Sequence, residues 1–347
     1  MQKFWFLISA CAFTLIGLSS ASARQYIDAQ NGNDSGTCPV TAPCATLNYA
    51  LSQVGSSSNE TIVIVKAGNF GPIYLTGSVF IVGADPSAQV QIYSDSTALV
   101  GCVGAAPGSC GPNNGYAVEI AAGVNNVVGF SHVLLEASHH GVPGVGALKF
   151  TSGGKIQLSD SMFHGNGSAT GPIVLLNPNN AGTTQAQVYF SHNDIGFNNN
   201  NTNAGAVLVQ PIGNTSLGLH FNHVQVHNAS YGIRTDGSSL LGPSAVVSTF
   251  ISDSEFFSFN NAAVNAFSTS GTGTVLATFD TNRILSSAAG LKANGPQSSV
   301  VLMNNTVTQN AIGVMQQNSA TVYTFGNNGI KNNNTDISGT LTPAPLQ

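Results

Sequence analysis

The side chains that could transfer protons are few in this sequence, and the best group of them lies in one stretch of the C-terminal half. Only 7% of the 347 residues are charged. Arg234 and Asp236 are followed, about one repeat later, by Asp253 and Glu255. Carboxylates near a base are the groups that general acid–base catalysis uses. Asp253 and Glu255 are two residues apart, so on a strand we expect both on one side. The alternative interpretation is that all four are solvated residues on the outside of the fold.

The histidines form a second candidate set. His132, His192 and His223 each follow a short apolar run, so we expect them to stack along one edge of the molecule. Such a column could bind a ligand or transfer protons, because imidazole titrates near neutral pH. A polar corner without a binding role is the alternative. We interpret His139 and His140, in a segment with Gly and Pro, as part of an exposed loop.

The N-terminal residues predict export. Residues 1–23 contain the basic Lys3, an apolar run at 4–18 and small residues at Ala21 and Ala23, the three parts of a secretory signal peptide. A lipoprotein site at Cys11 fits less well, because the apolar run continues past it. No other segment has the apolar length of a membrane span. We therefore expect a secreted or periplasmic protein.

The cysteines that remain after the expected signal form two close pairs. These are Cys38 with Cys44 and Cys102 with Cys110. An even number at short spacing in an exported protein predicts disulfides, and of three connectivities we favour the two local ones. Neither pair has the two-residue gap of a zinc knuckle, so we predict no metal site.

The composition favours β-structure. Val, Ile, Phe and Thr are plentiful, and the polar residues are mostly Asn, Ser, Thr and Gly rather than helix-forming Glu and Lys. The net charge is −5, and basic clusters are absent from the sequence. This pattern argues against nucleic acid as a partner.

A loose repeat recurs along the C-terminal two-thirds, with an apolar residue at the centre of each copy and a small polar residue, often Asn, after it. The central residues are Val133, Met162, Ile195, Val224, Phe256, Ile284, Val307 and Ile330. The last two gaps are 23 residues, which suits one coil of three short strands, and longer gaps add loops. We predict a single-stranded right-handed parallel β-helix at 61–338. Stacked Asn side chains at its corners, including those at 198–203, would bond from coil to coil.

The ends of the β-helix need separate elements. Leu47, Ala50, Leu51 and Val54 have helical spacing, and Thr46 is a suitable N-cap. We predict that this short helix at 45–54, within an N-terminal cap at 24–60, covers the first coil. The first strands are expected at 61–65, 72–75 and 79–82, and residues 339–347 as a flexible tail.

One segment resembles a known superfamily. The run Tyr-Ile-Asp-Ala-Gln-Asn-Gly-Asn-Asp at 26–34, with Ala-Pro-Cys-Ala-Thr-Leu at 42–47 and Ala-Leu at 50–51, is similar to the opening of bacterial pectate-lyase-like proteins. In that superfamily such a turn and helix lead into a right-handed β-helix. The resemblance implies a secreted protein that interacts with extracellular or cell-envelope polysaccharide. The superfamily includes lyases, hydrolases and epimerases, so the activity must be argued from the site.

The resemblance leaves three functions open. A lyase acting on an acidic glycan would need a Lys or Arg base and Ca²⁺ held by several carboxylates, so Ca²⁺ is expected only in that case. A glycoside hydrolase would need carboxylates close together. Of the polygalacturonase motifs, only Asn334-Thr335-Asp336 matches, and no histidine follows His227. The third alternative is a non-catalytic adhesin or structural surface protein. The oligomeric state is left open.

Overall fold

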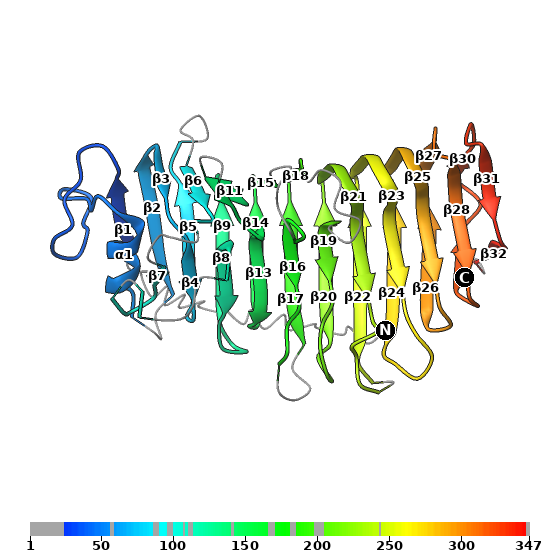
Figure 1. Cartoon of the computed structure of the whole chain (residues 1–347), viewed down its shortest axis with the longest axis horizontal. Helices are drawn as coiled ribbons and strands as arrows, with labels where there is room; N and C mark the ends of the chain where they lie inside the picture. Colours follow the sequence, from blue (N-terminus) through cyan, green and yellow to red (C-terminus); the bar gives the residue numbers. More distant parts are fainter. Residues whose placement is uncertain are drawn as a thin grey trace, which may run out of the picture.

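The chain winds into a single elongated coil of parallel strands (Figure 1). The computed structural model describes residues 24–344, apart from 56–58, 86–89, 96–99, 107, 110–113, 140–141, 166–170, 181–184, 198–204 and 243. Both the expected signal peptide at 1–23 and the Asn run at 198–203 therefore lie outside the described residues. The strands form one 12-stranded sheet, one 18-stranded sheet and a small hairpin. This confirms the predicted right-handed parallel β-helix.

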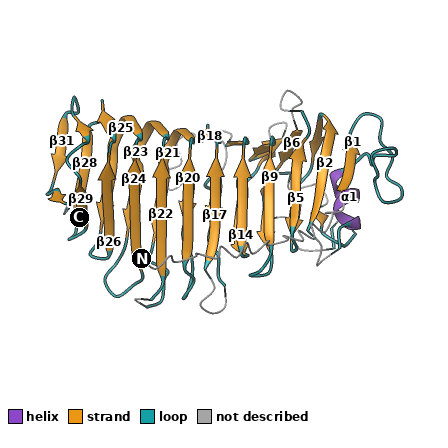
Figure 2. Ribbon diagram, turned by 180° about the vertical axis from the view of Figure 1, so that it is seen from behind, coloured by secondary structure: helices purple, strands orange, loops and turns teal. Residues whose placement is uncertain are grey.

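The 12-stranded sheet, which we call the back sheet, faces the reader in Figure 2. Its strands, in spatial order, are β1 (Arg24–Asp28), β2 (Glu60–Lys66), β5 (Val79–Gly83), β9 (Val127–Ser131), β14 (Lys155–Ser159), β17 (Ala186–Ser191), β20 (Leu217–Asn222), β22 (Val246–Ser252), β24 (Thr274–Asp280), β26 (Ser298–Met303), β29 (Thr321–Thr324) and β32 (Thr342–Pro343). Every pair of neighbours in it is parallel, so each coil contributes one strand.

The 18-stranded sheet bends into two limbs, because each coil crosses it twice. The side limb contains β3 (Gly68–Phe70), β6 (Val90–Tyr93), β10 (Leu134–Glu136), β15 (Met162–His164), β18 (Asp194–Gly196), β27 (Thr306–Thr308) and β30 (Gly329–Ile330). The front limb, which faces the reader in Figure 1, contains β4 (Ile73–Leu75), β7 (Gly101–Cys102), β8 (Tyr116–Ala121), β13 (Gly146–Ser152), β16 (Val174–Leu176), β19 (Gly205–Val209), β28 (Ile312–Gln317) and β31 (Thr335–Ser338). Three long strands bend through both limbs, namely β21 (Gln225–Asp236), β23 (Glu255–Phe267) and β25 (Arg283–Asn294). The hairpin is β11 (Ser138–His139) with β12 (Val142–Pro143).

The corner between the back sheet and the side limb has one residue per coil with a left-handed backbone, which we call the αL corner. Its members have φ between 49° and 59°, and they are His132, Asp160, His192, His223, Asp253, Thr281 and Asn304. The residue after each corner position turns inward and joins a polar ladder. Asn282 N donates to Asn305 Oδ1 at 3.0 Å, and Asn305 N donates to Asn328 Oδ1 at 2.9 Å. This confirms the predicted Asn stacking at this corner, which satisfies buried backbone N–H groups.

The core is a tube of inward apolar side chains. Along the side limb the register aligns Leu135, Phe163, Ile195, Val226, Phe256, Ile284, Val307 and Ile330. Three of the predicted central residues lie off this row, and of these only Met162 is exposed rather than buried. Met162 is 42% exposed and lies one position before the core position, while Val133 and Val224 lie in the corner ladder. A valine there preserves the apolar pattern but donates only its backbone N–H, to Ser161 Oγ and Ser254 Oγ respectively.

The N-terminal end is covered by the predicted helix, α1 (Leu47–Gln53), beside β1 (Figure 1). Thr46 is its N-cap and accepts from Tyr49 N at 3.2 Å, and Leu47, Ala50 and Leu51 are buried. At the other end, part of the predicted tail is ordered, because β32 pairs with β29.

The structure confirms the first of the two predicted cysteine pairs. Cys38 and Cys44 form a disulfide with a Cα–Cα distance of 5.0 Å. Cys102 is also disulfide-bonded, and its predicted partner Cys110 lies outside the described residues. No helix in the described part of the chain is long and apolar enough to cross a membrane.

Candidate functional site

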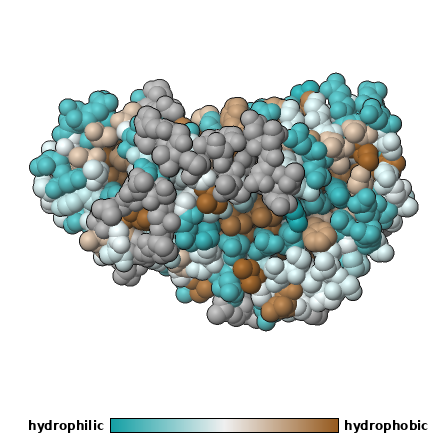
Figure 3. Space-filling model, in the orientation of Figure 1, coloured by the Kyte–Doolittle hydropathy of each residue, from teal (hydrophilic) through white to brown (hydrophobic). Residues whose placement is uncertain are grey.

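The outward face of the front limb carries a row of side chains, one per coil, which we call the front column. In register along the molecule it contains Tyr74, Glu119, Lys149, Leu175, Leu208, Arg234, Asn265, Lys292, Met315 and Ser338. Because neighbouring strands lie about 4.8 Å apart, Arg234 and Lys292 are about 10 Å apart along the molecular axis. The front surface mixes hydrophilic and hydrophobic residues (Figure 3). The front column thus places three bases on one face.

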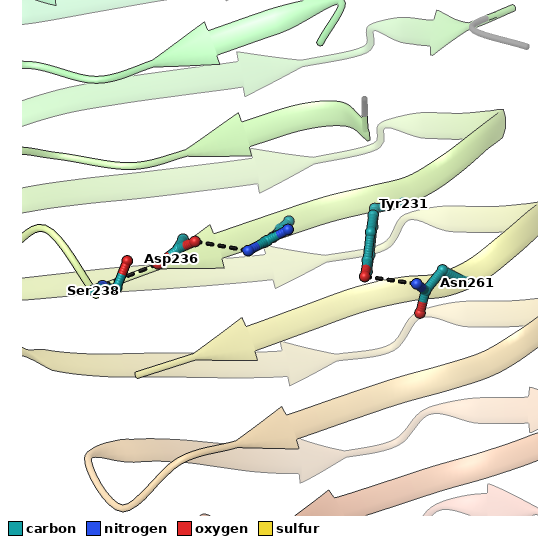
Figure 4. Close-up of polar contacts among 5 residues, drawn as sticks. Tyr231, Asp236, Ser238 and Asn261 are labelled. Carbon is teal, nitrogen blue, oxygen red and sulfur yellow. Dashed lines mark hydrogen bonds and ion pairs between the residues drawn. The ribbon is translucent and has the colours of Figure 1, made fainter. Parts of the chain in front are cut away.

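Arg234 and Asp236 form an ion pair on the front limb. Arg234 Nη2 lies 2.8 Å from Asp236 Oδ2, and the two side chains are 27% and 4% exposed. The second carboxylate oxygen of Asp236 accepts from Ser238 N at 3.0 Å, in the turn that ends β21 (Figure 4). The two carboxylate oxygens are therefore both engaged. The prediction that Arg234 and Asp236 act together is consistent with this geometry.

Aromatic rings fix the position of the Arg234 guanidinium. Its Cζ lies 5.5 Å from the ring centre of Tyr231 and 5.9 Å from that of Phe267, distances at which a ring face attracts a cation. The Tyr231 hydroxyl in turn accepts from Asn261 Nδ2 at 2.6 Å (Figure 4). The guanidinium is thus held between rings from its own strand and from the next coil.

Two polar atoms at this position have no hydrogen-bond partner among the described residues. They are Arg234 Nε and Asn265 Oδ1, both buried, on residues that face each other in register on β21 and β23. Buried polar groups are nearly always satisfied, so each exception needs an explanation. Both atoms are closed off from solvent, so a ligand would meet the exposed part of the Arg234 side chain rather than these two atoms.

The remaining charges of the front column are arranged around this centre. Lys149 Nζ pairs with Glu119 Oε1 at 3.0 Å, while Lys292 makes no ion pair within the described ranges. Burial raises the pKa of the Tyr116 hydroxyl far above its usual range, and the charge of Glu119 raises it further. Glu119 and Asp236 thus each pair with a base, and Lys292 is left without an ion-pair partner among the described residues.

The other two residues of the predicted acid–base cluster lie elsewhere. Asp253 is an exposed αL corner residue with φ 50°, so strand alternation does not place it with Glu255. Glu255 begins β23 on the side limb, where its Oε1 pairs with Arg283 Nη1 at 2.8 Å. Its register partner is Gln225, at the opposite end of β21 from Arg234. The four residues therefore lie at three separate places. Arg234 and Asp236 pair with each other on the front limb, Glu255 pairs with Arg283 on the side limb, and Asp253 lies at the αL corner.

The three histidines of the second candidate set share the αL corner. The rings of His192 and His223 stack at 4.8 Å with a 15° tilt, and Asp160 occupies the coil between His132 and His192. Ser131 Oγ lies 2.9 Å from His132 Nδ1, and Ser191 Oγ 2.9 Å from His192 Nδ1. His192 and His223 thus stack as predicted, His132 is separated from them by one coil, and the binding role stays a prediction. His140 lies outside the described residues.

A further histidine pair was missed by the sequence analysis. On the side limb, His227 Nε2 lies 2.8 Å from Asp194 Oδ1, and the Phe197 ring packs edge-on against both His227 and His164. Desolvation lowers the pKa of His164, with Asp194 opposing this effect and His227 adding to it. The signal available was only that Asp194 directly precedes, and His227 directly follows, the inward apolar residue of its coil. Among the described residues, no group of three or more His, Cys, Asp or Glu side chains is arranged to hold a metal ion.

Comparison with known proteins gives a match at the level of the fold. No family model matches the sequence, and no curated protein matches it. A crystal structure of pectate lyase Pel9A superposes with a TM-score of 0.57 at 15% identity, covering 94% of this chain and 79% of the lyase. The chain has a pectate-lyase-like β-helix fold.

Two other structures with this fold are more distant. A pectin methylesterase from Aspergillus niger matches at 8% identity with a TM-score of 0.39, over 94% of this chain and 87% of the esterase. A lacto-N-biosidase from Eubacterium ramulus matches at 9% identity with a TM-score of 0.39, over 93% and 67%. At these identities the likeness concerns the arrangement of the chain and leaves the function to the side chains.

Proposed function

We propose that the protein is a secreted or periplasmic β-helix that binds an extracellular or cell-envelope polysaccharide along the front column, with Arg234 at the centre of the site. The observation that carries this proposal is the front column itself, in which the Arg234 side chain is 27% exposed beside two aromatic rings and Lys292 lies two strands away. An acidic sugar offers hydroxyls and carboxylates, which both accept hydrogen bonds from Arg and Lys. The pectate lyase with a similar fold, whose name refers to an acidic glycan, supports the choice of ligand class.

Charge supports an acidic glycan over a neutral one. Lys292 has no ion-pair partner in the described part of the chain, and it is about 10 Å from Arg234, with Asn265 between them. Carboxylates form their strongest hydrogen bonds with Arg and Lys. We propose that successive acidic sugars place carboxylates near Arg234 and Lys292.

The geometry supports binding better than hydrolysis. Glycoside hydrolases place two carboxyl groups roughly 5–9.5 Å apart. Glu119 and Asp236 lie four strands apart along the front limb, about 19 Å. Ca²⁺ takes six to eight oxygen ligands, and the carboxylate oxygens of Asp236 already accept from Arg234 and Ser238. The described residues of the front column do not fit a Ca²⁺ site.

The proposal is tested by measuring the affinity of the mature protein for polygalacturonate and alginate oligosaccharides by calorimetry, with and without Ca²⁺. We expect Arg234→Gln to weaken binding at least tenfold and Lys292→Gln several-fold. The matched control is Arg283→Gln, which removes an arginine from an exposed ion pair on the side limb and should change the affinity less than twofold.

Lys292→Gln should disturb folding less than Arg234→Gln. It leaves no buried partner behind, whereas Arg234→Gln leaves the buried Asp236 without its ion-pair partner. Absorbance of unsaturated products in the same samples would show that the protein is a lyase that binds at this face. Equal affinity for wild type and both front-column variants would contradict the proposal.

A further inference from the structure

The back sheet, on the opposite side of the molecule from the front column, carries a groove that the proposed function does not use. It lies across the outward faces of β5, β9, β14 and β17, which are adjacent in Figure 2. Its volume is about 450 Å³, within the range of small-molecule sites. Its lining includes Phe80, Gly129, Lys155, Gln157, Tyr189 and a row of three serines.

Gly129 shapes the floor of this groove. A Cβ on Gly129 would stand 2.2 Å from Phe80 Cδ1 and 2.5 Å from its Cε1, so the Phe80 ring lies across β9 at this point. Phe80 and Gly129 face each other in register. The glycine therefore allows an aromatic ring to lie over the strand as part of the groove lining rather than stand away from it.

Tyr189 forms a wall. Lys155 Nζ lies 4.9 Å from the centre of its ring, and the His220 ring stacks parallel to it at 4.9 Å with a 7° tilt. Lys155 and His220 come from the strands on either side of β17, so both faces of the Tyr189 ring are covered and its edge is turned to the groove. From Phe80 to Tyr189 the groove spans three strand spacings, about 14 Å.

The polar lining converges on the same space. Ser131, Ser159 and Ser191 are aligned in register across three strands. Two of these hydroxyls lie 2.9 Å from the Nδ1 atoms of His132 and His192 at the αL corner. Among the described residues of the lining, Lys155 is the only charged one and none carries a carboxylate. The groove thus offers one flat ring, three hydroxyls, the Gln157 amide and one ammonium group.

We propose that this groove is a second saccharide-binding site, for a short oligosaccharide lying along the axis of the β-helix. A pyranose has an apolar face that packs on an aromatic ring and a rim of hydroxyls that exchange hydrogen bonds with Ser, Gln and Lys side chains. The Phe80 ring receives the apolar face, and Lys155, Gln157 and the serine row receive the rim. His132 and His192 are positioning residues, because each holds the hydroxyl of the adjacent serine. The site is independent of the front column.

The test is made in an Arg234→Gln, Lys292→Gln background, so that the front column does not contribute. Calorimetric titration uses four hexasaccharides: β-1,4-linked glucose, mannose, α-1,4-linked glucose and galacturonate. At least one of them should show saturable binding. Preference for galacturonate would show that Lys155 receives a carboxylate, and preference for a neutral hexamer that it receives a hydroxyl. Absence of binding by all four would overturn the proposal.

Three variants locate the site. Phe80→Ala and Lys155→Gln should each weaken the binding at least fivefold. Gly129→Ala should do the same without removing any lining side chain, because its Cβ displaces the Phe80 ring. The matched control is Tyr323→Ala, an aromatic residue facing outward on β29 of the same sheet, which should change the affinity less than twofold. Unchanged affinity in the three groove variants, with unfolding temperatures near that of the parent, would also overturn the proposal.

Discussion

Arg234 is held by contacts that leave part of its side chain exposed to solvent. Its Nη2 is used by Asp236, and two aromatic rings restrict its movement, while Nε has no partner among the described residues. A buried donor without a partner costs about 1–3 kcal/mol. Because Nε is closed off from solvent, this cost is part of the stability of the folded chain. A ligand would meet the exposed part of the guanidinium, which the ion pair and the two rings already hold in place.

A pH effect on stability is predicted at His164. Burial lowers its pKa below the ordinary 6.5, so the unfolded chain takes up the proton first as the pH falls. The folded state therefore loses stability as the pH drops below about 6.5, down to the lowered pKa. His164→Gln removes this loss, and the variant should keep more of its stability than wild type between pH 7.5 and pH 5 in urea unfolding. His192→Gln, at an exposed corner position, is the control, and the same pH dependence for wild type and His164→Gln would contradict the assignment.

At this scale the sequence predicts pairs better than sites. Arg234 and Asp236 could be placed together because they are two apart on one strand, where alternate side chains share a face. Asp253 could not be placed, since a left-handed corner residue and a strand residue look alike in an Asn- and Ser-rich sequence. Asn265 and Lys292 were not recognised as neighbours of Arg234, because insertions of varying length hide the register between coils.

The elements of this fold are held in register by the corner ladder. Asn305 Oδ1 accepts from Asn282 N, and Asn305 Nδ2 donates to Phe279 O at 3.0 Å and to Asn328 Oδ1 at 3.0 Å. One side chain therefore satisfies groups in the coils on both sides. A similar row at the next corner ends at Asp336, whose Oδ1 accepts from Asn333 N at 3.0 Å. The Asn-Thr-Asp sequence at 334–336 is thus part of a terminal cap of that row.

We predict that Asn305→Ala destabilises the protein by about 3 kcal/mol, because it leaves Asn282 N and Phe279 O buried without their partner. Asn125→Ala, at an exposed turn position, should change the free energy of unfolding by less than about 0.5 kcal/mol. Urea unfolding of both variants measures the difference. Equal stabilities would show that the ladder is not a main stabilising element.

The sequence predicts the elements well where the repeat is short and less well where loops interrupt it. The helix α1 and the last coils could be placed because Thr46 caps the helix and the 23-residue spacing is regular. In the middle of the chain Met162 was misassigned as core, and Val133 and Val224, although buried, were assigned to the wrong row. A valine at a ladder position or a methionine beside the core keeps the apolar count without showing which way the side chain points.

The whole molecule presents two long, parallel faces to solvent, one with bases and rings on the front limb and one with an aromatic groove on the back sheet (Figures 1 and 2). A parallel coil stacks equivalent positions at a constant spacing of about 4.8 Å. Any outward position therefore becomes a straight row, and a polymer that lies along the axis meets side chains from several coils. This geometry explains how a sequence with few charges can build an extended binding surface.

The measurement that tests the central claim most directly is a crystal structure of the mature protein with an acidic hexasaccharide. The account predicts that the sugar chain lies along the outside of the front limb, with a ligand oxygen within hydrogen-bond distance of the exposed part of the Arg234 guanidinium and an acidic group near Lys292 Nζ. Additional ligand in the back groove would agree with the second site. A front column without sugar in crystals saturated with ligand would contradict it.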